Sequence, residues 1–152
     1  MILLYEGIFF DGEDAKIIKS LEEKKLPIRS DILHCTFKYL PKKDEIFNQL
    51  VGKEFDVFLT GYACDGRNSG FSVQFTGDID DYYINFEEKD PSKLKRPHIT
   101  TSIAPGSKPM NTKDLDFVQF EKPIKVKGKF GYWVKDGYKQ YLMYKEFRGT
   151  NE

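Results

Sequence analysis

The chain contains two histidines, and each is followed two residues later by a threonine. The two strings are His34-x-Thr36 and His98-x-Thr100. Because serine and threonine are a minority of the residues, chance would produce this double match about once in a hundred chains. Histidine titrates near neutrality and serves as acid or base, and a hydroxyl can hold a phosphoryl oxygen on which negative charge builds up. The repeated string therefore predicts acid–base chemistry on a phosphate ester.

Both strings lie in segments that alternate between apolar and polar residues, which is typical of β-strands. The expected strands cover residues 31–40 and 96–103. The faces of the first strand carry Leu33, Cys35, Phe37 and Tyr39 on one side and Ile32, His34, Thr36 and Lys38 on the other. In the second strand, Ile99 and Ile103 lie on the face opposite the histidine. Residues two apart share a face, so each histidine and its threonine are expected to point together, away from the core.

Four further residues are candidates for substrate contact. Lys38 and Ser102 follow the two strings on the histidine faces of their strands, so each is expected to line one wall of the site. Trp133 and Tyr144 lie on the lysine-bearing face of the last hairpin and are candidates to stack on a base, with a partly buried rim as the alternative of equal weight.

The remaining elements follow from spacing and turn residues. Helices are expected after Asp11, with Pro27 as the stop, and over residues 44–50. Strands are expected over 2–10, as a hairpin over 55–59 and 71–75, and over 124–134 and 138–147, with a frayed tail at 148–152. The segment 78–95 is polar and ambiguous, and 82–86 is interpreted as a short strand. The last hairpin is expected to turn at Asp136-Gly137, which pairs Tyr132 with Tyr141 and Trp133 with Gln140.

Size, composition and charge limit the class of protein. We expect one domain over residues 1–152, of which 39% are hydrophobic and 32% charged. No apolar run reaches the roughly 20 residues that span a bilayer, and the apolar start is interpreted as a buried strand rather than a signal peptide. The formal net charge is zero, which disfavours a partner of long nucleic acid, because such binding depends on neutralising phosphates.

The cysteines carry no sign of a metal site. Cys35 and Cys64 have no C-x-x-C spacing, so we expect reduced thiols, no metal and no other cofactor. We expect a cytoplasmic protein, located in the host cytoplasm if the source is viral. The lysine runs at 38–43 and 122–129 are interpreted mainly as solvated strand faces and turns. Nothing in the sequence indicates the oligomeric state.

The two strings and the order of elements resemble the 2H phosphoesterase superfamily, and in particular its LigT-like members. His34-Cys35-Thr36-Phe37 is similar to the first motif of that family, and Arg96-Pro97-His98-Ile99-Thr100 to the second. The resemblance implies an α+β, bilobal fold in which two antiparallel sheets face each other across a central groove, with helices outside. It also implies that the two histidines are acid and base, and that the two threonines hold the phosphate.

Two features depart from the family pattern. Thr101 stands where the family usually has an apolar residue, and the segment 77–95 is short and polar for the helix of a second lobe.

The expected function is therefore a metal-independent phosphodiesterase, an enzyme of the 2H type. Its substrate is expected to be a small nucleotide: a cyclic nucleotide, a cyclic oligonucleotide signal or a short oligonucleotide. One alternative is an RNA 2′,3′-cyclic phosphodiesterase that acts on RNA ends. An alternative of another class is a non-catalytic module that sequesters a nucleotide, against which the intact histidine pair argues, because binding alone favours Arg or Lys. An RNA-binding adaptor is disfavoured by the charge balance.

Overall fold

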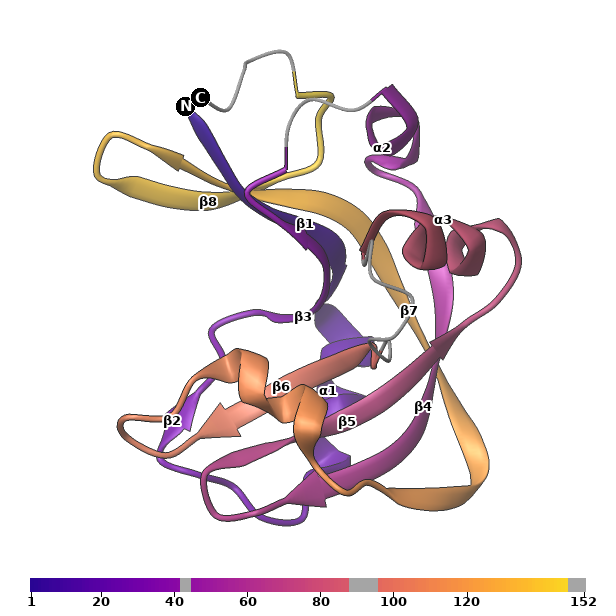
Figure 1. Ribbon diagram of the computed structural model, residues 1–152, viewed down its shortest axis with the longest axis vertical. Coiled ribbons are helices and arrows are strands. Elements are labelled where there is room, and N and C mark those ends of the chain that lie inside the picture. The colour runs from indigo at the N-terminus through magenta and orange to yellow at the C-terminus, as the bar shows by residue number, and fades with distance from the viewer. Residues whose placement is uncertain (42–44, 88–95, 148–152) are drawn as a thin grey trace.

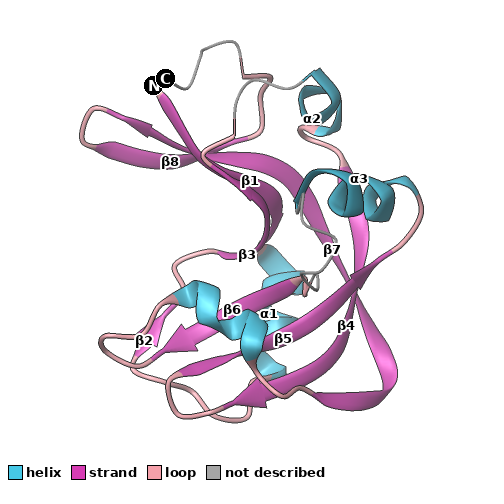
Figure 2. Cartoon of the chain, viewed as in Figure 1, coloured by secondary structure: helices cyan, strands magenta, loops and turns pink. Residues whose placement is uncertain are grey.

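A computed structural model describes residues 1–41, 45–87 and 96–147. Within these residues the protein is α+β, as expected, with eight antiparallel strands in one sheet and few helices. Figure 2 shows that strands, rather than helices, dominate the secondary structure of this part of the chain. The elements in chain order are β1 (Ile2–Phe10), α1 (Gly12–Leu21), β2 (Ile28–Arg29), β3 (Leu33–Tyr39), α2 (Glu45–Leu50), β4 (Glu54–Cys64), β5 (Asn68–Phe75), α3 (Asp78–Glu87), β6 (His98–Ile103), the 3₁₀ helix η1 (Pro109–Asp114), β7 (Val118–Asp136) and β8 (Lys139–Met143).

The strands of the sheet form two halves with similar arrangements. The strand order is β2-β6-β5-β4-β7-β1-β3, and β8 pairs with β7. The order β6-β5-β4 is mirrored by β3-β1-β7, and in each half the two outer strands are connected through a helix, α3 or α1. The two motif strands, β3 and β6, therefore occupy equivalent positions.

The two separate sheets of the expected bilobal fold are not confirmed, because β7 joins the halves into one hydrogen-bonded sheet. This strand is 19 residues long. Residues 118–129 pair with β4, and residues 129–135 pair with β1. Figure 1 shows β7 running between the part of the sheet that contains β1 and β8 and the part that contains β4 and β5.

The sheet is bent enough to bring its two ends together. β2 lies at one end of the strand order and β3 at the other, yet only residues 30–32 separate them in the chain. The four residue steps from Arg29 to Leu33 can span at most about 14 Å. The chain itself therefore holds the β6 side of the sheet close to β3, although no ladder of hydrogen bonds closes the sheet.

An aromatic core supports the back of β3. The ring of Phe37 lies 5.1 Å from those of Phe75 and Tyr83 and 5.5 Å from that of Phe130, measured between centroids. These side chains are at most 4% exposed. Packing of this kind leaves few alternative positions for the strand that carries the first motif.

Residues 82–86, expected as a short strand, belong instead to helix α3. Ile79 and Tyr83, four residues apart, are both buried, which is the spacing of one helical face. The strand prediction for 82–86 was therefore wrong, because Tyr82, Ile84 and Phe86 also fit a period of two. Residues 88–95, the rest of the ambiguous segment, lie outside the described residues, as do the tail at 148–152 and residue 44 of the expected helix.

The last hairpin has a different register from the expected one. Asp136 pairs with Lys139, so the two turn residues are Gly137 and Tyr138, and Tyr132 pairs with Met143. Gly137 has φ +63°, and a glycine at the first central position is the requirement of a type II′ turn. The prediction of a type I′ turn placed the glycine second and shifted every pair by two residues. The expected hairpin of β4 and β5 is confirmed.

Within the described residues, no helix has the length and apolar character needed to cross a membrane.

Candidate active site

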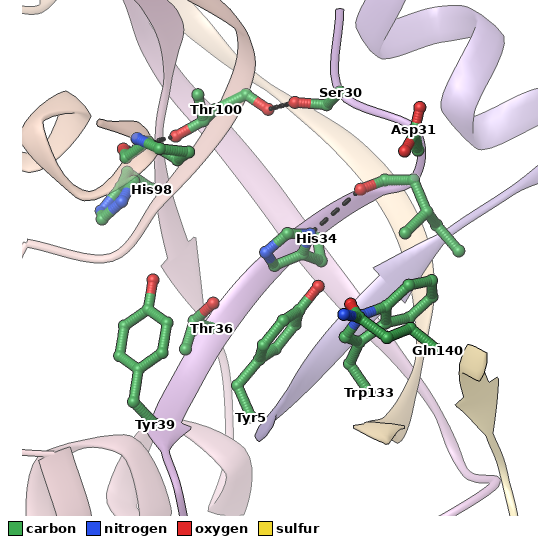
Figure 3. Close-up of a pocket in the computed structure, with 12 residues that line it drawn as sticks. Tyr5, Ser30, Asp31, His34, Thr36, Tyr39, His98, Thr100, Trp133 and Gln140 are labelled. Atoms are coloured by element: carbon green, nitrogen blue, oxygen red, sulfur yellow. Dashed lines mark hydrogen bonds between the residues drawn. The ribbon is translucent and has the colours of Figure 1, made fainter. Parts of the chain in front are cut away.

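The fold brings both His-x-Thr strings to one pocket of about 240 Å³. Figure 3 shows His34 and Thr36 on one side of this pocket and His98 and Thr100 on the other. The lining residues are Tyr5, Ser30, Asp31, Ile32, His34, Thr36, Tyr39, His98, Thr100, Pro109, Trp133 and Gln140.

Each imidazole is oriented by a carbonyl two residues earlier in the chain. Nδ1 of His34 lies 3.0 Å from the carbonyl oxygen of Ile32, and Nδ1 of His98 lies 2.9 Å from that of Arg96. A carbonyl oxygen can only accept, so Nδ1 carries the proton in both rings. In the neutral rings the lone pair is then on Nε2. Both histidines thus have the same tautomer and offer the same reactive atom.

The environment favours neutral imidazoles. Burial lowers the pKa of His34 below its ordinary value, the bond to Ile32 offsets part of this, and repulsion from a charged His98 lowers it further. Burial also lowers the pKa of His98, where Lys113 adds to the effect and Asp114 opposes it. Because the two rings repel each other when charged, the state with one proton on the pair is favoured over the doubly protonated state.

The two threonines differ in how their hydroxyls are occupied. Oγ1 of Thr100 donates to the carbonyl oxygen of Pro109 at 2.9 Å, and it lies 2.8 Å from Oγ1 of Thr112. A hydroxyl has one proton, so this proton is committed to the η1 segment. For Thr36, no hydrogen-bond partner is found among the described residues. Its hydroxyl is the one that can donate to a substrate without first breaking a bond.

The threonine of each motif pairs with a glycine on the neighbouring strand. Gly7 is opposite Thr36, and Gly70 is opposite Thr100. A Cβ on Gly7 would lie 2.1 Å from the carbonyl oxygen of Cys35, and a Cβ on Gly70 would lie 2.3 Å from that of Ile99. Only glycine allows the strands to approach this closely. The sequence contained both glycines, but no local pattern indicated that they pair with the motifs.

A β-bulge follows each motif and explains why Lys38 and Ser102 do not line the pocket. Thr36 pairs with Gly7 and Lys38 with Glu6, so Phe37 is an extra residue. In the same way, Thr100 pairs with Gly70 and Ser102 with Ser69, which leaves Thr101 extra. A bulge shifts the alternation by one residue, so the fourth residue after each histidine turns to the opposite face.

The expected wall positions of Lys38 and Ser102 were therefore wrong. Lys38 is exposed outside the pocket, and Ser102 is buried and donates to Oε2 of Glu22 at 2.7 Å. The bulge in β3 instead turns Tyr39 into the pocket, although this residue was expected on the core face.

Of the two candidate stacking residues, Trp133 lines the pocket and Tyr144 does not. Tyr144 follows the last residue of β8, and Lys129 Nζ lies 4.9 Å from the centre of its ring. It also lies against Gly131, where a Cβ would come within 2.7 Å of its ring. This residue fills the space beside the strand and not the site.

Sequence reasoning missed the aromatic residue closest to the first histidine. The rings of Tyr5 and His34 are stacked with centroids 4.7 Å apart. The ring of Trp133 stacks on Tyr5 as well, with centroids 6.3 Å apart and an interplanar angle of 18°. Burial raises the pKa of Tyr5, so its phenol is protonated at neutral pH. Tyr5 belongs to β1, and no sequence signal indicated that β1 lies next to the first motif.

Comparison with known proteins does not identify a family for this chain. No protein-family model matches the chain, and no curated protein sequence matches it. Within residues 1–41, 45–87 and 96–147, no three His, Cys, Asp or Glu side chains lie together in a way that could hold a metal ion.

Proposed function

We propose that this protein is a phosphodiesterase that cleaves a small nucleotide substrate with His34 and His98 as its acid–base pair. One observation carries the proposal: both imidazoles line the same pocket, and a backbone carbonyl holds each in the tautomer that leaves Nε2 for the substrate. Two independent surface histidines would not need matched restraints of this kind.

The reaction follows from these two atoms. The neutral Nε2 of one histidine accepts the proton of the attacking oxygen, which belongs to a substrate hydroxyl or to water, while that oxygen forms a bond to phosphorus. The protonated Nε2 of the other histidine donates its proton to the leaving oxygen as the second P–O bond breaks. The hydroxyl of Thr36 donates to a non-bridging oxygen, where charge builds up in the transition state. After turnover the two histidines have exchanged protonation states, and solvent resets them.

The surroundings of the histidines support a nucleotide as substrate. Tyr5, Tyr39 and Trp133 offer aromatic surface on which a base can stack. An apolar hollow of about 480 Å³ adjoins the pocket past Tyr39 and is also lined by Met110. The pocket and this hollow together fall within the range of about 300–1,000 Å³ that is typical of sites for small ligands.

The resemblance to 2H phosphoesterases supports the same proposal. We further propose that the two halves of the sheet, each with one motif on an outer strand, correspond to the two lobes of that family. An RNA 2′,3′-cyclic phosphodiesterase would use the same histidine pair, so the choice of substrate separates these two activities.

The test is turnover by purified protein. Wild-type protein is incubated in EDTA with cyclic nucleotides, cyclic and linear dinucleotides and an oligonucleotide ending in a 2′,3′-cyclic phosphate, and products are separated by chromatography. We expect hydrolysis in EDTA and a loss of about 10²- to 10⁴-fold in His34→Ala and in His98→Ala. The double variant should be little slower than either single variant, since the two groups act as a unit.

Lys38→Ala is the matched control, because Lys38 is on the same strand as His34 but turned out of the pocket. It should keep the wild-type rate. Folded histidine variants with near-normal rates, or activity that EDTA removes and zinc or manganese restores, would contradict the mechanism. Tight binding of a nucleotide without any product would instead identify a sequestering module.

A further inference from the structure

A buried carboxylate lies directly behind the second motif and takes no part in the proposed reaction. Glu22 is the residue that ends helix α1, and its side chain is 0% exposed. It is distant in sequence from the motif but in contact with it, because the chain after α1 runs along β6. Its position in the fold, rather than any local pattern, makes it a candidate for a role at the site.

Three hydroxyls converge on one oxygen of this carboxylate. Oε2 accepts from Ser69 at 2.8 Å and from Ser102 at 2.7 Å. Oγ1 of Thr101 lies 2.5 Å from Oε2 and 2.9 Å from the carbonyl oxygen of Ser69, so these two acceptors share its one proton. The other oxygen, Oε1, forms an ion pair with Nη1 of Arg29 at 2.6 Å. Each hydroxyl has one proton, and only an ionised carboxylate accepts from this many donors without offering one of its own.

The surrounding bonds leave the hydroxyl of Ser102 a single orientation. Ser102 Oγ accepts from the backbone N–H of Leu26 at 2.9 Å, so its own proton is directed at Glu22. Burial alone would raise the pKa of Glu22, yet the bonds from the hydroxyls and Arg29 hold that pKa below its ordinary value. The carboxylate therefore remains charged at neutral pH.

These bonds hold the bulge that directly follows Thr100 in β6. Thr101 is the extra residue of β6, and its side chain and that of Ser102 both bind Glu22. In the first motif the corresponding extra residue, Phe37, packs against the rings of Phe75, Tyr83 and Phe130. Thr101 has a hydrogen-bond partner here that an apolar side chain could not replace.

We infer that Glu22 is a positioning residue for the second motif, which sets where His98 and Thr100 meet the substrate through the bulge at Thr101. The inference rests on the proposed function. A displacement of about 1 Å in a reacting group costs on the order of a hundredfold in rate, so a loosened bulge should lower kcat even in a folded protein.

Variants at both ends of the key bond test this role. In Glu22→Gln and in Thr101→Val we expect kcat to fall at least about tenfold, with KM changed less than about threefold. Thr101→Ser keeps the hydroxyl and should retain the wild-type kcat. Glu23→Gln is the matched control, because Glu23 is the exposed neighbour of Glu22. If Glu22→Gln does not fold, the comparison of Thr101→Val with Thr101→Ser still decides the matter.

Nuclear magnetic resonance of the imidazoles gives a readout that needs no turnover. With two histidines in the chain, the spectrum contains two ring signals. Glu22→Gln and Thr101→Val should displace the His98 signal and its Nδ1–H tautomer population, while Glu23→Gln leaves both signals in place. If the wild type cleaves no phosphodiester, the proposed function fails but these signals still test the positioning role. Folded variants with wild-type kcat and an unmoved His98 signal would overturn the inference.

Discussion

Each imidazole of the pocket is fixed by a bond that is entirely local in sequence. The acceptor is the carbonyl two residues before the histidine, so a short stretch of strand suffices to select the tautomer. The sequence indicated the histidines as a pair through the repeated His-x-Thr string and not through these bonds. It did not indicate their pKa values, because these depend on burial, which long-range packing decides.

The lowered pKa values predict an acidic optimum. The free enzyme must hold one histidine neutral and one protonated, so kcat/KM should have a bell-shaped profile. Because the pKa values of His34 and His98 both lie below the ordinary value of about 6.5, the maximum should lie on the acid side of that value. Initial rates at low substrate concentration, measured from about pH 4.5 to 8.5, would test this. A maximum above pH 7 would contradict it.

Unfolding measurements should show the same shifts. The folded pKa values lie below those of the unfolded chain, so the unfolded state binds more protons as pH falls below about 6.5. The free energy of unfolding should therefore decrease from that pH down to the folded pKa values, and it should be unaffected by these groups above it. Replacing both histidines with Gln should flatten this part of the curve. An unchanged slope would show that other groups cause it.

The two threonines should respond differently to substitution. Thr36→Ala should lower kcat about 10²- to 10³-fold, as loss of a donor to a developing charge does, and Thr36→Ser should restore most of it. Thr100→Ala should lower kcat less, because the Thr100 proton is held by Pro109, and should instead lower the melting temperature. Steady-state kinetics and thermal melts of the three variants decide this. A larger kcat loss in Thr100→Ala at equal folding would show that Thr100 redirects its proton to the substrate.

At the scale of elements, alternation predicted the motif strands well up to the bulges and not beyond them. His34 and Thr36 point into the pocket as expected, but the extra residue Phe37 sends Lys38 out and Tyr39 in. A bulge depends on the partner strand, and here the partner is β1, which lies some 30 residues earlier in the chain. The predicted register of the β7–β8 hairpin was wrong because Gly137 fits the second position of a type I′ turn as well as the first position of a type II′ turn.

The paired glycines give a prediction about the strands themselves. Gly7→Ala and Gly70→Ala must move a backbone carbonyl, which costs about 1–3 kcal/mol in an overpacked interior. Because the displaced carbonyls are those of Cys35 and Ile99, within the motifs, kcat should also fall.

Gly61→Ala is the control for the glycine variants. A Cβ there would meet the carbonyl oxygen of Val118 at 2.8 Å, and it would do so away from the pocket. This variant should lose stability and keep its kcat. Urea unfolding and kcat per folded molecule separate the two effects, and equal kcat losses in all three variants would contradict a specific role for Gly7 and Gly70.

At the scale of the whole molecule, the order of the strands in the sheet could not be predicted from the sequence. The α+β class and most elements followed from periodicity, but each strand of the motifs pairs with partners that no local signal identifies. The near-palindromic order β6-β5-β4-β7-β1-β3 becomes visible only when all registers are known. The similar halves explain why each motif has its own restraining carbonyl, opposing glycine and following bulge. In the sequence, the His-x-Thr string is the longest repeat that we recognise.

The place of β7 in this order has a consequence for synthesis on the ribosome. Among the described strands, β7 alone pairs with strands of both halves, β1 on one side and β4 on the other, and it starts at Val118. Both histidines have therefore been translated before the strand that aligns them exists. In a nascent chain that ends before residue 118, β1 and β4 lack the strand that pairs with both of them, so their open edges are exposed to mispairing at the stage when chaperones bind. Activity should appear only once β7, which spans Val118–Asp136, has left the exit tunnel.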